Sequence, residues 1–402
     1  MTGLKGRLNI ADILFVLSMT FVLAIPGPSR MKAISIIAFF CYMIVVKLIN
    51  FREKHNRLHI VWLFSFLILA YLSKRWALYP QAVSEQITNV LWTVLLSIAI
   101  AEYVICYKLD AEKIAKRILF ISIIFIINIL LNAVFTNGRL SIGINENTFG
   151  RIASGMTCFL FFYCKKQKWR NIFWDIITAV MAIVVFLSGS RTCLIILAIY
   201  IVALIFFEHP SRNILKYVGS ALLFLVVCIF CYILIMNIDF LYNSIGNRFE
   251  SFIGAISGNS TGDGSMITRQ NMIEYAKNIF IEHPWIGIGL NNFKYATYFN
   301  TYAHSNYYEL AACLGVVGLA VYYLPLIIYL IKAMKMWIAN IAESIIPFSI
   351  FAAFLVGDFG SVTYFNPIPH VFIGLAIGML CNNMYSYKKE EGYINEFNKI
   401  DF

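Results

Sequence analysis

A polar segment, His304-Ser305-Asn306, stands directly before a long apolar run. An imidazole with an ordinary pKa of about 6.5 can be neutral at pH 7 and accept a proton, so His304 is the candidate catalytic base. Glu309 follows one helical turn further into the run, where a carboxylate is costly unless it is paired. These residue types indicate proton transfer at the start of an apolar helix, with Ser305, Asn306 and Glu309 in support.

Small residues follow His304 at helical spacing. On a continuous helix, His304, Tyr308, Ala311, Gly315 and Gly318 would share one face. Small residues three or four apart allow a neighbouring helix to approach closely. We therefore expect His304 to cap a tightly packed helix pair, with Gly315 and Gly318 at the contact.

Arginines form the second group with a possible chemical role. Arg191 follows Ser-Gly-Ser at the start of another apolar run, and Arg269 lies on the apolar face of a helix predicted within 266–284. Guanidinium groups present a planar donor fork that suits phosphate. Arg191 and Arg269, with Arg248 as a third member, predict a site for a diphosphate or a similar anion. The alternative is that each arginine snorkels at a helix end or pairs with a carboxylate.

Composition identifies the elements that must position these residues. The 402 residues are 60% hydrophobic and 13% charged, with a mean hydropathy of +0.75, unlike a soluble domain. Apolar runs long enough to cross a bilayer recur along the chain, and in lipid such runs must be helices. We predict an all-α polytopic membrane protein with about twelve spans, near 10–28, 31–47, 58–73, 87–107, 118–136, 152–164, 172–188, 192–207, 217–237, 303–331, 343–357 and 368–386.

The net charge of +11 reflects topology rather than nucleic-acid binding. With both termini inside, most lysines and arginines fall in the predicted inner segments, which is the positive-inside pattern; attraction to anionic membrane lipid is secondary. We expect four parts: helices one to nine in 1–237, a large external loop with an amphipathic helix in 238–302, helices ten to twelve in 303–387, and a cytoplasmic tail in 388–402.

The predicted outer face carries the arginines and the histidine. The inner loops are too short for a nucleotide-binding domain, and neither a phosphate-cradling glycine loop nor a metal-ligand spacing is evident. We therefore expect no metal and no other cofactor. A transferase that faces outwards would draw its activated group from a membrane lipid.

Several motifs together resemble the O-antigen ligase and polysaccharide polymerase superfamily of bacterial envelopes. His304-Ser305, nine residues and then Gly315-Val-Val-Gly318 resemble the family's histidine motif. "SGSR" at 188–191 is similar to its outer arginine motif. "TRQNMIEYAKNIFIEHPWIGIGLNNF" resembles its loop segment, and "GINENTFGR", which contains Asn147, is similar to its segment before a middle helix.

This resemblance implies a GT-C-like, twelve-helix protein of the cytoplasmic membrane whose active site faces the periplasm or the outside. It implies an undecaprenyl-diphosphate-linked glycan donor and metal-independent, inverting transfer. Arg191 and Arg269 would hold the diphosphate, and His304 would deprotonate or orient the acceptor hydroxyl. Capsule or lipopolysaccharide biosynthesis would be the setting, with a chain-length regulator as a possible partner.

Three functions remain open. A polymerase would join lipid-linked repeat units, and Leu319 after the second motif glycine favours it over the ligase branch. A ligase would transfer finished glycan to lipid A core or another acceptor. A transporter or flippase for the same lipid-linked glycan would show broken polar helices near the midplane, often in two related halves. Asp358 has no assigned role, and His283 and His370 are interpreted as structural.

Overall fold

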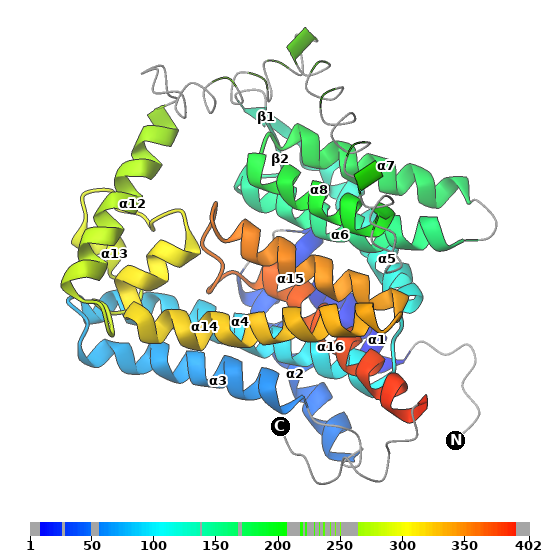
Figure 1. Cartoon of the computed structure of the whole chain (residues 1–402), viewed down its shortest axis with the longest axis horizontal. Coiled ribbons are helices and arrows are strands. Elements are labelled where there is room, and N and C mark those ends of the chain that lie inside the picture. The colour runs from blue at the N-terminus through cyan, green and yellow to red at the C-terminus, as the bar shows by residue number, and fades with distance from the viewer. Residues whose placement is uncertain are drawn as a thin grey trace.

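The computed structural model describes residues 9–25, 29–49, 56–136, 139–167, 171–206 and 264–390, with isolated positions between 207 and 263. This part of the chain is almost entirely helical (Figure 1). Its elements are α1 Ile10–Met19, η1 Thr20–Ala24, α2 Ser29–Ile49, α3 Arg57–Leu72, η2 Ser73–Arg75, α4 Pro80–Cys106, α5 Ala111–Asn132, β1 Val134–Thr136, β2 Arg139–Ser141, α6 Glu146–Lys166, α7 Ile172–Leu187, α8 Arg191–Phe206, α12 Gly264–Glu282, α13 Phe293–Ala296, α14 Asn306–Ile338, η4 Ala342–Ser344, α15 Ile345–Gly357 and α16 Pro367–Glu390.

The prediction of an all-α polytopic membrane protein is confirmed. Within the described residues, six helices are long and apolar enough to cross a membrane, and shorter apolar helices accompany them. Eleven predicted spans coincide with helices there, and the ninth, 217–237, lies largely outside the described residues. The fifth span is wrong at its end, because 134–136 form one strand of a short antiparallel hairpin with 139–141.

Local chemistry accounts for where several helices begin. Pro80 opens α4, where its fixed φ and missing N–H cost nothing. Asp110 caps α5 by accepting a hydrogen bond of 2.8 Å from the Lys113 amide. Asn145 caps α6, and Asn171 caps α7, through their side-chain oxygens. The sequence therefore contains the start signals of these helices.

The buried centre is formed by α4 and α16. A Cβ on Gly374 would lie 2.8 Å from the Ser97 carbonyl oxygen, and a Cβ on Gly378 would lie 2.5 Å from Val104. Glycines four residues apart allow the two helix backbones to approach closely. The side chains of both helices are largely buried as a result.

The helix that follows His304 is broken rather than continuous. Gly315 has φ 64° and ψ −160° inside α14, a region open essentially to glycine. At the break, backbone amides and carbonyls of α14 have no partner within the helix, and the loop after α12 supplies their hydrogen bonds. Ile288 and Gly289 donate to the carbonyls of Ala312 and Cys313 at 3.1 and 2.8 Å, and Val316 and Val317 donate to those of Pro284 and Trp285 at 2.8 and 3.1 Å.

This break overturns the expected helix face. His304 lies before the first helical residue of α14, so it does not share a continuous face with Gly315 and Gly318. Gly315 packs against the Trp285 backbone, from which an added Cβ would lie only 2.4 Å away. The close approach is therefore between a helix and a loop, not between two helices.

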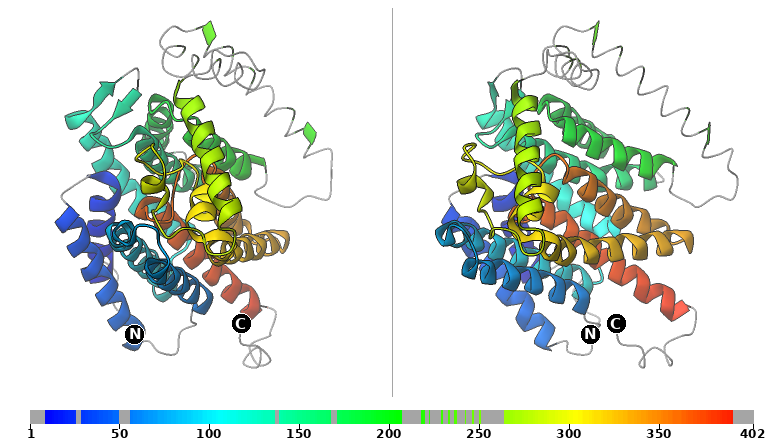
Figure 2. Two further views of the ribbon diagram at one scale, coloured as in Figure 1. Left: turned by 90° about the vertical axis from the view of Figure 1, so that its left-hand side faces the viewer. Right: turned by 60° about the vertical axis from the view of Figure 1, so that its left-hand side comes forward.

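The same loop also binds the connection between α3 and α4. The Leu78 amide donates to the Ile288 carbonyl at 3.1 Å, and the Leu290 amide donates to Ser73 Oγ at 3.1 Å. The Tyr79 amide donates to Asn292 Oδ1 at 2.6 Å. Figures 1 and 2 show α12 at one end of the bundle, steeply inclined to α14 rather than running along it. The segment around α12 and α13 is thus attached to the predicted outer end of the bundle.

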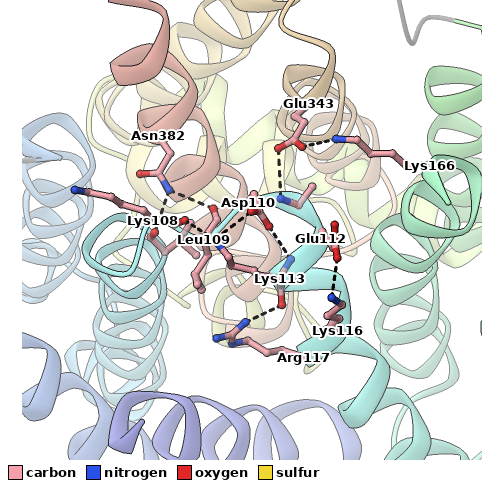
Figure 3. A network of polar contacts seen from close by, with 12 residues as sticks. Lys108, Leu109, Asp110, Glu112, Lys113, Lys116, Arg117, Lys166, Glu343 and Asn382 are labelled. Atoms are coloured by element: carbon pink, nitrogen blue, oxygen red, sulfur yellow. Dashed lines mark hydrogen bonds and ion pairs between the residues drawn. The ribbon is translucent and has the colours of Figure 1, made fainter. Parts of the chain in front are cut away.

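A polar network lies at the predicted inner side (Figure 3). Glu343 pairs with Lys166 at 2.7 Å and accepts a hydrogen bond of 3.4 Å from the Ala111 amide. Asn382 Nδ2 donates to the carbonyls of Val104 and Leu109 at 3.0 and 3.2 Å. These contacts connect α4, α5, α6, η4 and α16 at that end.

Candidate active site

The candidate site is built on the turn that precedes α14. His304 has φ 54°, a left-handed conformation that is uncommon for residues other than glycine. Ser305 then occupies the N-cap position of α14. Its Oγ donates to the Asp358 carbonyl at 3.2 Å, and the Asn306 amide donates to the same carbonyl at 2.8 Å. The connection between α15 and α16 therefore holds the His304 turn.

Asn306 strengthens this attachment through a fully buried side chain. Its Nδ2 donates to Asp358 Oδ2 at 3.0 Å and contacts the Tyr323 hydroxyl at 2.8 Å. Its Oδ1 accepts from the backbone amides of Thr363 and Tyr364 at 3.0 and 3.2 Å. A side chain with every polar atom used in this way has one allowed orientation.

Asp358 is the centre of the network, although the sequence leaves it without a role. Its carboxylate is fully buried and accepts hydrogen bonds of 2.8 Å from Thr363 Oγ1 and from the Tyr323 hydroxyl. Asp358 also ends α15 as its C-cap residue. These contacts assign Asp358 a structural role beneath the His304 turn.

The imidazole of His304 lies half-buried beside an aromatic ring. Its centroid is 4.7 Å from that of Tyr302, which in turn contacts Phe365 at 6.0 Å. Burial, and second the positive charge of Arg269, lower the pKa of His304 to about 4. Both causes disfavour the charged imidazolium. His304 is therefore neutral at pH 7 and offers a lone pair to a donor.

Arg269 reaches this site from α12. Met272 and Ala276 are buried, as the predicted apolar stripe requires, and α12 ends before Pro284 as predicted. Arg269 itself is half-buried, and its charge acts on both Tyr302 and His304. Arg269 is thus near enough for its charge to act on the imidazole of His304, and the roles predicted for the two residues stay predictions.

Glu309 lies beneath the turn and is fully buried. Its Oε2 accepts a hydrogen bond of 2.7 Å from the Ala303 amide, and its Oε1 accepts one of 3.6 Å from the Cys313 thiol. The carboxylate therefore holds the residue before His304 in place. The supporting role in the reaction that the sequence predicts for Glu309 stays a prediction.

Arg191 begins α8 and is half-buried. Its neighbour Thr192 lies against the α15–α16 connection, because a Cβ on Gly360 would lie 2.3 Å from Thr192 Oγ1. The segments that carry Arg191 and His304 consequently contact the same loop, 358–366. Arg248 lies outside the described residues, so its predicted place beside Arg191 and Arg269 stays a prediction.

Two further arginines, which the motifs did not indicate, lie close to the start of α8. Arg139, on β2, donates from Nε to the Ser188 carbonyl at 2.9 Å and from Nη2 to Asn147 Oδ1 at 3.2 Å. It also pairs with Glu146 at 3.2 Å. Asn147 accepts a hydrogen bond from Cys193 at its carbonyl oxygen, so it connects α6 with α8. The segment 139–147 as a whole supports the start of α8.

Arg151 is the second missed residue, although it ends the quoted segment "GINENTFGR". It is buried on α6, where its Nη2 donates to the Gly357 carbonyl at 3.2 Å and to Ser361 Oγ. Arg151 also lines a narrow recess that is partly open to the surroundings. The other lining residues are mainly apolar and come from α6, α8, α15 and α16: Ser154, Gly155, Ile196, Tyr200, Ile350, Ala353, Phe354, Pro369 and Phe372.

The fold and the site define a polytopic membrane protein with a buried polar network beneath a half-buried histidine and arginine. A model of the O-antigen ligase family matches residues 176–323. The matched region includes Arg191, Arg269 and His304, and it agrees with the resemblance drawn from the motifs. This match supports a function of the O-antigen ligase or polymerase type. No curated protein matches the chain.

Proposed function

We propose that the protein transfers a glycan from a polyprenyl-diphosphate carrier to an acceptor hydroxyl at the outer face of the cytoplasmic membrane. The observation that carries this proposal is the half-buried His304 turn, which the Asn306–Asp358 contacts hold in place and whose imidazole is close enough to Arg269 to be affected by its charge. A base and an anion-binding group within one small site suit a reaction that removes a proton and releases a phosphate.

His304 is the proposed catalytic base. Its lone pair orients the acceptor hydroxyl and takes the proton as the oxygen attacks the anomeric carbon. The bond from that carbon to the diphosphate breaks in the same displacement, so the configuration inverts. Arg269 and Arg191 stabilise the charge that develops on the departing diphosphate. The helix that carries Arg269 contacts α14 through Lys277 and Tyr308, and the residue after Arg191 lies against the 358–366 loop.

A lipid-linked donor suits the membrane setting, because the chain has several helices long and apolar enough to cross a bilayer. The reactive end of such a donor would lie at the membrane surface, where we place the His304 turn. Undecaprenyl diphosphate is the carrier that the family resemblance implies, and its glycan would extend to the outer side.

Polymerisation of repeat units is the form of the reaction that we favour, because Leu319 departs from the residues that often follow the motif in ligases. A ligase is the second candidate, since the matching family model is described as O-antigen ligase. Both use one site and one chemistry and differ in the acceptor. In either setting a chain-length regulator would be a natural partner.

Reconstitution distinguishes these forms. The purified protein would be placed in liposomes with lipid-linked repeat units and no other acceptor, and the glycans would be sized on a gel. A ladder of longer glycans establishes a polymerase. Product that forms only after addition of lipid A core or another acceptor establishes a ligase. Donor binding without transfer in either assay contradicts the enzyme and favours a transporter.

A further inference from the structure

Buried polar atoms without partners are concentrated in one part of the bundle. Among the residues that the structure describes, six buried side-chain nitrogen or oxygen atoms have no hydrogen-bond partner. One belongs to Ser190 in the arginine motif. The other five belong to α3, its N-cap, the segment that leads into α16 and α16 itself: Asn56, His59, Trp62, Tyr364 and His370. Such atoms are rare in proteins, and a cluster of them requires a physical cause.

The first three residues follow one face of α3. Asn56 is the N-cap, and His59 and Trp62 follow at intervals of three residues, which places them along the same side of the helix. All three are at most 5% exposed. This side faces α14 and α16, because the ring of Trp62 lies 6.1 Å from that of Tyr322 and 6.5 Å from that of His370.

In each imidazole one ring nitrogen has a hydrogen-bond partner and the other has none. His59 Nε2 bonds Ser97 Oγ on α4 at 3.1 Å, and His370 Nε2 bonds the Tyr322 hydroxyl at 3.1 Å. The Nδ1 atom of each imidazole is left without a partner. Trp62 lies between the two, with centroid distances of 5.9 Å to His59 and 6.5 Å to His370.

We propose that α3, α14 and α16 enclose a binding site for internal water, centred on His59, Trp62 and His370. A water molecule accepts a hydrogen bond from Trp62 Nε1, which can only donate, and donates to an imidazole Nδ1. Two hydrogen bonds of about 2.9 Å through one water separate their end atoms by roughly 5 Å, so one water can bridge atoms on the edges of rings whose centroids are 5.9 to 6.5 Å apart. Several polar partners make such a buried water stable.

The water site completes a polar track into the apolar part of the bundle. Asp358 accepts from Thr363 Oγ1 at 2.8 Å, and Thr363 Oγ1 contacts the Tyr322 hydroxyl at 3.3 Å, which reaches His370. Water then connects His370 with His59 and Ser97. Further along α3, the Tyr329 hydroxyl donates to Asn56 Oδ1 at 2.8 Å. This series of polar groups therefore begins beneath the His304 turn. The proposal of a water site does not depend on the proposed activity.

Radiolytic footprinting tests the site directly. X-rays generate hydroxyl radicals from bound water, so buried residues beside water are oxidised and dry ones are not. The full chain would be irradiated in detergent micelles or nanodiscs, and modification would be measured by mass spectrometry. Rates would be divided by the intrinsic reactivity of each residue type. We expect Trp62, His59 and His370 to react several-fold faster than Phe125 and Phe159, which are equally buried.

A variant identifies the water as the source of labelling. Trp62→Phe removes the N–H that binds the water, so labelling of His59 and His370 should fall towards the level of the buried phenylalanines. The matched variant Trp92→Phe, on α4, should leave their labelling unchanged. Equal, background labelling of His59, Trp62 and His370 in the wild-type protein overturns the proposal, because it shows the cluster to be dry.

Discussion

The side-chain amide of Asn306 donates a hydrogen bond of 3.0 Å to the buried carboxylate of Asp358, and so joins the start of α14 to the end of α15. The same amide and the Tyr323 hydroxyl both donate hydrogen bonds to Asp358 Oδ2. The orientation of the His304 turn thus depends on a carboxylate more than fifty positions away in the chain.

Replacing Asp358 by asparagine should weaken both the fold and the reaction. One oxygen becomes an NH₂ group that faces existing donors, which leaves a buried hydrogen bond unmade at a cost of roughly 1–3 kcal/mol. We expect a lower unfolding midpoint in detergent and slower glycan transfer. Glu112→Gln is the matched control, because Glu112 is exposed and its pair with Lys116 is a surface ion pair. An unchanged midpoint for Asp358→Asn would show that the network adds no stability.

His304→Asn should abolish most transfer without disturbing the turn. Asparagine tolerates the left-handed conformation but cannot act as a base. Loss of general base catalysis typically reduces rates by about 10²–10⁴-fold. Donor binding, measured by a lipid-linked ligand competition, should be retained. His283→Asn, in the same loop and exposed, should keep full activity; a similar loss there would mean that His304 has no special role.

The pH dependence of transfer should report the depressed pKa of His304. Because burial and Arg269 lower this pKa to about 4, the imidazole stays neutral from about pH 8 to pH 6. The transfer rate should therefore be constant over that interval. Arg269→Gln removes one cause, so the acid limb should move up towards the ordinary value of about 6.5. Profiles of single-turnover rates would show this. Identical acid limbs in both proteins would contradict the electrostatic contact.

The free energy of unfolding should also decrease as the pH falls. The pKa of His304 is lower in the folded protein than the ordinary value of about 6.5 expected in the unfolded chain. The unfolded chain therefore binds more protons between these values, so stability is full above the higher value and declines as the pH falls. Unfolding midpoints measured from pH 7 to pH 5 should fall less in His304→Asn than in wild type. Parallel curves would rule out this contribution.

Gly315→Ala should be strongly destabilising. Alanine is strained at φ 64° and ψ −160°, at a cost of roughly 1–3 kcal/mol, and its Cβ would meet the Trp285 backbone at 2.4 Å. Gly287→Ala should behave similarly, because its Cβ would meet the Cys313 backbone at 2.3 Å. Val316→Ala is the neighbouring control and is exposed. Thermal unfolding and transfer assays would rank the three variants, and a harmless Gly315→Ala would mean that the break is dispensable.

Arg139→Ala should impair donor binding more than the chemical step. Arg139 donates hydrogen bonds to the Ser188 carbonyl and to Asn147. Without them, the segment that precedes Arg191 should become more mobile. We expect KM for the lipid-linked donor to rise several-fold while kcat changes less. Arg75→Ala, at an exposed position of η2, serves as the control. A fall in kcat with an unchanged KM would instead place Arg139 in the chemical step.

Much of the fold follows from the sequence, because lipid permits few backbone structures. A long apolar run in a bilayer must satisfy its own hydrogen bonds, so hydropathy alone locates helices such as α2 and α4. The same reasoning extended the fifth span over 134–136, since three apolar or hydroxyl-bearing residues do not reveal a hairpin. Spacing also selected His304 and Arg191, whose roles stay predictions, and it predicted the helix that carries Arg269, which the structure contains as α12.

What only the tertiary structure decided is how these segments meet. Sequence periodicity assumes a continuous helix, whereas a glycine break at Gly315 is stabilised by backbone groups of another segment, which no local pattern reveals. Asp358 and Arg151 gained their roles for the same reason, since their partners lie on distant elements. Helix formation is a local property of the chain, but the neutral imidazole of His304 depends on burial and on Arg269, which only the packed bundle provides.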